Sequence, residues 1–170
     1  MDLKNYIKNV ADWPIKGVAF KDITPTLMNP KAFQNSVNEL HKRYKEFKLD
    51  KIVAIESRGF IWGSVLAYKL SLPLIIARKE GKLPRNTIKQ SYSLEYNSSS
   101  LEIHKDAIKK GDRILLFDDV LATGGTASAV TNLVKNLGGI VVECSFLVDI
   151  VGLQKVPEIK KHKTFSLLHS

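Results

Sequence analysis

Residues 118 to 126, here called the 118–126 loop, combine the side chains in this sequence that are best suited to binding an anion. Gly124 and Gly125 carry no Cβ, so the backbone can approach a ligand closely. Thr123 and Thr126 add hydroxyl donors, and a helix beginning here would add unpaired amides and the positive end of its dipole. The loop contains no lysine and lacks the G-x-G-x-x-G spacing, which excludes two common nucleotide-binding motifs. The loop thus offers amide and hydroxyl donors but no fixed cation. This combination predicts a binding site for a phosphate monoester.

Two adjacent carboxylates, Asp118 and Asp119, open this loop directly after an apolar run. They would repel a bound phosphate, so their own partner must be neutral hydroxyl groups, a cation, or positive charge that develops during a reaction. The vicinal hydroxyls of a ribose whose 5′-phosphate occupies the loop satisfy the first condition. The pattern therefore favours a sugar phosphate as the ligand class.

Two further segments follow apolar runs and carry charged side chains. Residues 56–59, Glu-Ser-Arg-Gly, come after the run 52–55 and open a predicted helix, so their amides face the same crevice. Arg58 would add a charge-assisted contact to an anion. The basic segment, residues 78–89, holds five cations against one acid, Glu80. Cations on a mobile loop would neutralise a pyrophosphate and then release it; from these residues alone, a simple solvated loop is an equally good interpretation.

The elements that must position these segments follow from hydrophobic periodicity. Short, unbroken apolar runs are typical of strands buried on both faces. They alternate with stretches of helical spacing, the first of which has Asn29 as a capping residue and Pro30 at the first helical position. The expected strands are 52–55, 73–77, 113–117, 140–148 and 165–168; the expected helices are 29–47, 59–70 and 125–137; and a hairpin is expected from 88–96 and 101–104, with a turn at 97–100.

This alternation predicts an α/β fold. Strands joined through helices give right-handed crossovers and a parallel sheet covered by helices on both faces. In such folds ligands bind beyond the carboxyl ends of the strands. A site is therefore expected after Ile55, after Ala77 and after Phe117.

Composition limits the class of protein. The 170 residues, 44% hydrophobic and 25% charged, are expected to form one domain, 1–170, with a substantial core. No apolar run approaches 18 residues and the N-terminal sequence lacks an apolar signal region, so we expect neither a membrane span nor secretion, but a cytoplasmic location. Cys144 is the only cysteine, which excludes an internal disulfide, and with four scattered histidines it leaves no zinc-type cluster.

The net charge of +9 suggests an anionic partner: nucleic acid, an anionic lipid surface or a phosphorylated small molecule. The distribution of the cations matters more than their sum. Besides the basic segment, one cluster stands out near the end of the sequence, and we interpret it as solvated surface lysines: Lys155, Lys160, Lys161 and Lys163.

The order of residues around the 118–126 loop also resembles a known signature. Phe117 to Thr126, F-D-D-V-L-A-T-G-G-T, resembles the phosphoribosyl pyrophosphate motif of the type I phosphoribosyltransferases. Other segments occur in the order found in the adenine-specific branch of that family, and the resemblance extends from about Trp13 to Leu168; these segments are 17–25, 56–60, 78–84 and 92–96.

The resemblance implies a fold and an activity. The fold would be the type I phosphoribosyltransferase fold, in which helices flank a central, mostly parallel sheet, with a small N-terminal hood region at 1–30 and a flexible loop and β-hairpin at 78–104. The activity would be a pentosyltransferase reaction of purine salvage, in which phosphoribosyl pyrophosphate and adenine give AMP and pyrophosphate. Mg²⁺ would arrive on the substrate pyrophosphate, without a dedicated set of protein ligands. A homodimer is implied, with no nucleic-acid or membrane partner.

The resemblance further implies roles for individual residues. Catalytic roles fall to Glu95, Asp118 and Asp119. Phosphate and ribose contacts fall to Asp118, Asp119, Ala122, Thr123, Gly124, Gly125 and Thr126. Pyrophosphate contacts fall to Glu56, Ser57, Arg58, Arg78, Lys79 and Lys82, with a non-proline cis peptide between Glu56 and Ser57. Adenine contacts fall to Val18, Ala19, Phe20 and Lys21, where Lys21 replaces the arginine, and Ala19 the bulkier aliphatic residue, of many relatives.

Two alternatives remain open at this point. The same scaffold would serve another purine, such as hypoxanthine or xanthine. A non-catalytic regulator would use the phosphoribosyl pyrophosphate site as a sensor and its basic surface to bind nucleic acid. Against the regulator, the sequence shows no helix-turn-helix pattern and no interleaving of aromatic and basic residues.

Overall fold

The computed structural model describes residues 2–93 and 98–170, so Glu95 lies outside the described residues. The strands are β1 (Lys8–Val10), β2 (Phe20–Asp22), β3 (Lys51–Ile55), β4 (Leu74–Lys79), β5 (Thr87–Ser93), β6 (Ser98–His104), β7 (Arg113–Phe117), β8 (Val120–Leu121), β9 (Ile140–Asp149) and β10 (Thr164–His169). The helices are α1 (Thr24–Met28), α2 (Pro30–Tyr44), α3 (Gly59–Leu70) and α4 (Gly125–Asn136), with 3₁₀ helices η1 (Leu3–Tyr6) and η2 (Ile159–Lys161).

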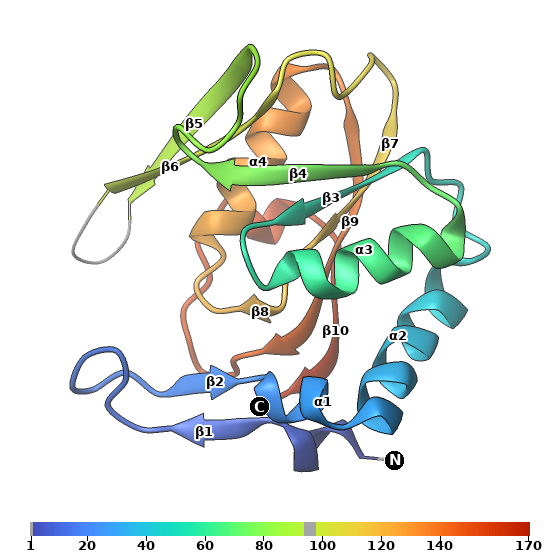
Figure 1. Cartoon of the computed structure of the whole chain (residues 1–170). Helices are drawn as coiled ribbons and strands as arrows, with labels where there is room; N and C mark the ends of the chain where they lie inside the picture. The colour runs from blue at the N-terminus through green and yellow to red at the C-terminus, as the bar shows by residue number, and fades with distance from the viewer. Residues whose placement is uncertain (1, 94–97) are drawn as a thin grey trace.

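The main sheet has the strand order β10-β9-β7-β3-β4-β6-β5, and β8 also pairs with β9. The strands from β10 to β4 are parallel, whereas β6 is antiparallel to both β4 and β5. The predicted mostly parallel α/β sheet is therefore confirmed. Because β7, β3 and β4 are parallel neighbours, their carboxyl ends lie at one edge of the sheet (Figure 1).

Hydrophobic cores cover both faces of this sheet. Strand β7 contributes Leu115 and Phe117 to the core beneath α2 and α3. It contributes Ile114 and Leu116 to the core beneath α4. This alternation is expected of a strand whose successive side chains point to opposite faces, and it explains why the run is apolar throughout. In Figure 1, α3 and α4 lie on opposite sides of the sheet.

The helix ends follow the predicted signals. The Asn29 side chain caps α2 by accepting a hydrogen bond from the Ala32 amide at 3.0 Å, as predicted. Helix α2 ends at Tyr44, before the expected end at residue 47. Helix α4 ends at Asn136, and Gly138 follows in the left-handed conformation that closes many helices.

The boundaries around the basic segment were predicted incorrectly. Strand β4 continues to Lys79, because Arg78 and Lys79 pair with β6. Strand β5 begins at Thr87, so only residues 80–86 form a connecting loop. Residues 98–100, expected in a turn, belong to β6, where the Ser100 hydroxyl lies 2.9 Å from that of Ser91 across the ladder.

The N-terminal region forms a small unit of its own. Strands β1 and β2 make a separate antiparallel sheet, confirming the expected small N-terminal element. The Lys21 ammonium donates a 2.7 Å hydrogen bond to the Ser170 hydroxyl, which ties β2 to the chain beyond β10. Figure 1 shows this unit lying below the main sheet, beside the C-terminus.

Candidate active site

The segments that carry the predicted chemistry converge at the carboxyl edge of the sheet. Residues 56–59 follow β3, the 118–126 loop follows β7, and Arg78 and Lys79 end β4. The topology therefore brings together residues that lie far apart in the sequence, as expected for ligand binding at this edge. The peptide bond between Glu56 and Ser57 is cis, which confirms that expectation.

The 118–126 loop is anchored on one side by β9. The Asp118 amide donates to the Ser145 carbonyl at 3.1 Å, and the Asp119 carbonyl accepts from the amides of Leu147 and Val148 at 3.0 Å each. The loop then forms the short strand β8 and reaches Gly124, whose φ of 85° lies in the left-handed region. Helix α4 begins at the next residue, so its first amides have no acceptor within the helix.

The two acids of the loop have different surroundings. Asp119 is 4% exposed, and its Oδ2 lies 2.8 Å from Nε of Arg58. Asp118 Oδ1 accepts a 2.9 Å hydrogen bond from the Asp119 amide. Burial raises the pKa of Asp118 well above its ordinary value of 3.8, and the charge of Asp119 raises it further. Burial also raises the pKa of Asp119, although Arg58 opposes this shift. The two carboxyl groups would therefore interact favourably with hydroxyl donors of a ligand, or with positive charge that develops on it.

Gly59 allows α3 to approach the acidic pair closely. A Cβ at this position would lie 2.9 Å from Asp118 Oδ1 and 3.1 Å from the Phe117 carbonyl oxygen. Any side chain at residue 59 would consequently displace the end of β7. The glycine after the Glu-Ser-Arg triplet is thus required for the position of Asp118.

Arg58 connects three parts of the predicted site. Besides the ion pair with Asp119, its guanidinium lies 4.6 Å from the ring centroid of Phe20. Its NH1 also donates to the Lys21 carbonyl at 3.4 Å. Phe20 in turn makes an edge-on contact with Trp13, at a centroid distance of 4.3 Å. The N-terminal unit and the 118–126 loop are therefore linked through one guanidinium.

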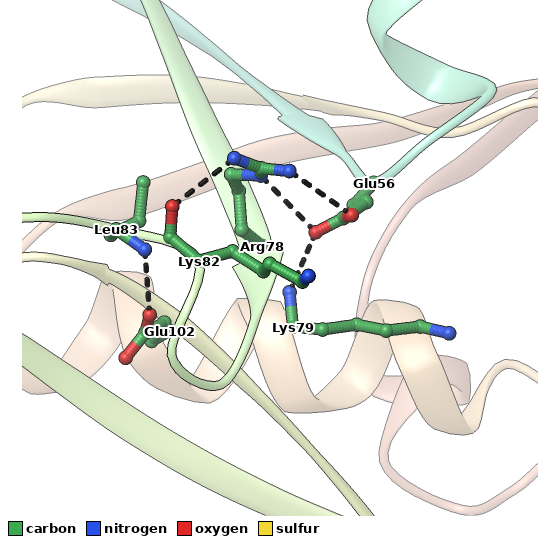
Figure 2. A network of polar contacts seen from close by, with 6 residues as sticks. All are labelled: Glu56, Arg78, Lys79, Lys82, Leu83 and Glu102. Atoms are coloured by element: carbon green, nitrogen blue, oxygen red, sulfur yellow. Dashed lines mark hydrogen bonds and ion pairs between the residues drawn. The ribbon is translucent and has the colours of Figure 1, made fainter.

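Glu56 organises the end of β4 through a network of polar contacts (Figure 2). Its carboxylate accepts hydrogen bonds from Arg78, at 3.2 Å from Nε and 3.3 Å from NH2, and from the Lys79 amide at 2.8 Å. NH1 of Arg78 donates to the Lys82 carbonyl at 3.1 Å, and the Leu83 amide donates to Glu102 at 3.1 Å. Glu56 and Glu102 therefore hold the connecting loop 80–86 against the sheet.

The cations of the basic segment divide into two groups. Arg78, Arg85 and Lys89 each pair with a carboxylate, namely Glu56, Asp106 and Glu80. Lys79 and Lys82 are exposed and make no ion pair within residues 2–93 and 98–170. Figure 2 shows the Lys79 side chain extending away from Arg78. Lys79 and Lys82 are therefore the members best placed to meet an added anion.

The Glu56 network has a testable pH dependence. Partial burial opposes ionisation, but the Lys79 amide and Arg78 outweigh it and hold the pKa of Glu56 below its ordinary 4.5. A lowered pKa in the folded state gives stability that is present above pH 4.5 and lost as the pH falls through the lowered value. Glu56→Gln should therefore lower the free energy of unfolding by roughly 1 kcal/mol at pH 7. Denaturant titrations of both proteins should show this difference shrinking below pH 4.5, and a difference that grows in acid would contradict the assignment.

The predicted adenine-binding residues lie in and before β2. Val18 and Ala19 are exposed, Phe20 is half-buried against Arg58, and Lys21 is buried with its ammonium on Ser170. The side chain of Lys21 is thus engaged with the C-terminal residue, and its carbonyl faces Arg58. Glu95 lies outside the described residues.

Lys155 was interpreted incorrectly as a solvated lysine. Its ammonium pairs with Asp149 at 2.6 Å and donates to the carbonyls of Leu121 and Ala122 in the 118–126 loop, and to that of Ile150. The only sequence signal was the nearby Asp149, which is too weak to distinguish it from an exposed neighbour. The sequence-based site therefore lacked a residue that contacts its central loop.

The chain holds no helix long and apolar enough to cross a membrane among residues 2–93 and 98–170. Within the same described ranges, no group of three or more histidine, cysteine, aspartate or glutamate side chains is arranged to hold a metal ion.

Comparisons with known proteins agree on one family. The model of the phosphoribosyl transferase domain matches residues 28–168. The chain is 49% identical to an adenine phosphoribosyltransferase of Desulfosudis oleivorans, over 99% of this chain and 97% of the relative. A crystal structure of adenine phosphoribosyltransferase from Thermoanaerobacter pseudethanolicus superimposes with a TM-score of 0.95 and 44% identity, covering 99% of this chain and 98% of the other.

A third comparison includes bound molecules. The Saccharomyces cerevisiae adenine phosphoribosyltransferase was crystallised with D-2,5-dideoxy-2,5-imino-altritol 1,6-bisphosphate and adenine. It is 34% identical, with a TM-score of 0.85, covering 98% of this chain and 96% of that structure. On the family model and on relatives that match nearly the whole length, the chain belongs to the type I phosphoribosyltransferase family, in its adenine phosphoribosyltransferase branch.

Proposed function

We propose that this chain transfers the 5-phosphoribosyl group from phosphoribosyl pyrophosphate to adenine, giving AMP and pyrophosphate. The observation that carries the proposal is the convergence of the 118–126 loop, its paired acids and Arg58 at one sheet edge, with the N-terminal unit joined to them through Phe20. The names of relatives that match the full length support adenine as the base.

In this reaction the 118–126 loop holds the sugar phosphate. The amides of Ala122 to Gly125 and the hydroxyls of Thr123 and Thr126 donate to the 5′-phosphate. Asp118 and Asp119 accept hydrogen bonds from the ribose hydroxyls and favour the positive charge that develops on the ribose as pyrophosphate departs. The enzyme's contribution is to position the two reactants and to stabilise the separating charges.

The leaving pyrophosphate is received by the neighbouring segments. Ser57 and Arg58 lie at the start of α3, and Arg78 is fixed by Glu56, which leaves Lys79 and Lys82 to contact the anion. The Glu56 carboxylate itself faces Arg78 and Lys79, so its role is to orient these residues.

Mg²⁺ fits this arrangement as part of the substrate. The ion prefers oxygen ligands and is commonly held by substrate phosphates with few carboxylates. Asp118 and Asp119 supply carboxylate oxygens at the loop, whereas the nearby carboxylate of Glu56 is already paired with Arg78. When bound, the ion neutralises part of the charge on the pyrophosphate.

The base is received by the N-terminal unit. The backbone around Val18 and Ala19 and the ring of Phe20 provide an apolar cover with polar main-chain groups, which suits a flat neutral purine. From the family resemblance of the sequence, Glu95 is proposed as the acid/base residue for the purine. Glu95→Gln should lower turnover and flatten the acidic limb of the pH–rate profile; an unchanged profile would remove Glu95 from this role.

We propose that the functional form is a homodimer of single-domain chains in the cytoplasm. Helix α3 is apolar around most of its circumference, yet Tyr68 is 85% exposed, and the nearby Leu74 at the start of β4 is also exposed. Tyr68 on α3 and Leu74 on β4 therefore leave large apolar side chains exposed on two successive elements, and apolar surface of this kind is what a subunit interface covers.

The dimer interface can be tested by introducing charge on α3. Tyr68→Asp should convert the dimer to a monomer, because a carboxylate buried at an interface is costly. Light scattering after size exclusion measures the mass directly. Val151→Asp, at an exposed apolar residue elsewhere, is the matched control and should remain dimeric. A dimeric Tyr68→Asp protein would exclude this face.

The activity is tested by incubating the protein with labelled adenine, phosphoribosyl pyrophosphate and Mg²⁺ and following AMP. Parallel reactions with hypoxanthine and xanthine determine the base specificity. If a nucleotide formed from hypoxanthine and from neither of the other bases, hypoxanthine and not adenine would be the substrate. Binding of phosphoribosyl pyrophosphate without turnover, together with salt-sensitive binding of nucleic acid, would instead support a regulator.

A further inference from the structure

We propose that Lys155 is a positioning residue for phosphate binding, and that with Val156 and Ile159 it orients the amides of the 118–126 loop from the side opposite the ligand. The inference rests on the proposed function, in which this loop holds a 5′-phosphate. The 155–159 segment lies between β9 and β10 and was not among the predicted site residues.

The ammonium of Lys155 is fully committed to neighbouring oxygens. It donates to the carbonyls of Leu121 at 3.2 Å, Ala122 at 2.6 Å and Ile150 at 2.9 Å, and it pairs with Asp149 Oδ1 at 2.6 Å. An ammonium has three N–H donors, so these contacts use all of them. Its side chain is only 19% exposed. Lys155 therefore acts on the loop and not on an anion in solution.

The same segment binds three successive carbonyls of the loop. Lys155 binds those of Leu121 and Ala122, and the Val156 amide donates to the Thr123 carbonyl at 2.9 Å. The peptide bonds concerned are trans, so each N–H points away from the C=O of its own peptide plane. The amides that belong to these carbonyls are those of Ala122, Thr123 and Gly124, which must therefore point away from the 155–159 segment.

These amides are available for a ligand. None of the three donates a hydrogen bond within the part of the chain that the structure describes. Successive amides directed to one side form a concave site for an anion. Helix α4 starts at Gly125, directly after them, and extends the site with its own unpaired amides.

Ile159 closes the space behind this site. A Cβ at Gly124 would lie 2.7 Å from Ile159 Cγ2 and 3.0 Å from Ile159 Cβ. The isoleucine, which is 1% exposed, thus fills the volume into which the loop would otherwise relax. The polar contacts of Lys155 and Val156 and the packing of Ile159 act on consecutive residues of one loop.

The test compares Lys155→Met with Lys160→Met, which removes the same charge from an exposed lysine directly after the 155–159 segment. Calorimetric titration with ribose 5-phosphate should show binding weakened about 10-fold by Lys155→Met, since charged hydrogen bonds that fix the amides are lost. The KM for phosphoribosyl pyrophosphate should rise similarly while the KM for adenine stays within about 2-fold. Lys160→Met should bind like the wild type, and Lys155→Arg should recover most of the affinity.

Several outcomes would overturn the inference. A folded Lys155→Met protein with wild-type affinity for ribose 5-phosphate would leave Lys155 a purely structural lysine, even if its Tm were lower. If Lys155→Met does not fold, the Ile159→Ala variant tests the inference in its place, because it loosens the same loop without removing a charge. An unchanged affinity of Ile159→Ala for ribose 5-phosphate would also overturn the inference. Failure of the wild type itself to bind ribose 5-phosphate would overturn the proposed function, and this inference with it.

Discussion

Asp119→Asn should lower kcat/KM for phosphoribosyl pyrophosphate by roughly 100-fold while leaving the fold intact, because it removes a preorganised charge from the point where positive charge develops. Asp119 is buried beside Arg58, and burial raises the pKa of its carboxyl. The neutral amide avoids this cost of burial but leaves Arg58 without its counter-charge, so we expect a folded protein with a lowered free energy of unfolding. Steady-state kinetics and thermal unfolding of the same preparation measure both quantities.

The matched control for this prediction is Asp106→Asn. Asp106, in the turn after β6, also pairs with an arginine, Arg85 of the basic segment, but both of these side chains are exposed. Exposed ion pairs contribute little, so this variant should behave like the wild type. Equal activities of the wild type and Asp119→Asn would remove the ribose role of Asp119 and, with it, the main chemical argument for the site.

Gly124→Ala should both destabilise the protein and weaken the binding of phosphoribosyl pyrophosphate by more than about 10-fold. Gly124 has a φ of 85°, where any other residue costs about 1–2 kcal/mol. The added methyl group would also lie 2.7 Å from Ile159 Cγ2, so the loop must shift away from the 155–159 segment. Chemical denaturation and the KM for phosphoribosyl pyrophosphate report the two effects separately.

The Gly152→Ala variant separates the conformational cost of a left-handed alanine from the steric cost of a methyl group placed against Ile159. Gly152 has a φ of 90° and nothing within 4 Å of an added Cβ, so its substitution carries the conformational cost alone. It should destabilise less than Gly124→Ala and leave the KM unchanged. Adding Ile159→Ala to Gly124→Ala should recover part of the stability, since the contact is relieved. A Gly124→Ala protein with wild-type stability and KM would show that the loop tolerates a side chain there.

The sequence was sufficient for the fold and for the centre of the site, because these depend on local patterns. The apolar runs, the Asn29 cap and the acid-glycine order of the 118–126 loop each have a short-range physical cause, and the structure contains all of them. The local residue order at 56–59 predicted a helix start and an anion contact for Arg58. The cis peptide between Glu56 and Ser57 was predicted only through resemblance to a family.

The features of the fold and of the site that could not be predicted from the sequence depend on contacts between residues that are distant in the chain. Lys155 reaches the carbonyl of Leu121 across 34 positions, and nothing in its neighbourhood separates it from the exposed Lys160. The extension of β4 to Lys79 arises from pairing with β6, and β8 exists because it lies against β9. Periodicity cannot reveal such features, since partner strands and buried carbonyls are assembled only in three dimensions.

Arg58 contacts both Phe20 and Asp119, and this has a thermodynamic consequence. A group that is shared by two subsites makes their affinities interdependent, and the coupling must be equal in both directions. If occupancy of the sugar subsite changes the ion pair between Asp119 and the guanidinium, and with it the contact between the guanidinium and the ring of Phe20, the affinity for the base changes. Binding of the base must then change the affinity for the sugar by the same coupling free energy. The order in which the substrates bind and the selectivity for the base would then both depend on the contacts of Arg58. Substitutions in the N-terminal unit would consequently alter the affinity for the sugar.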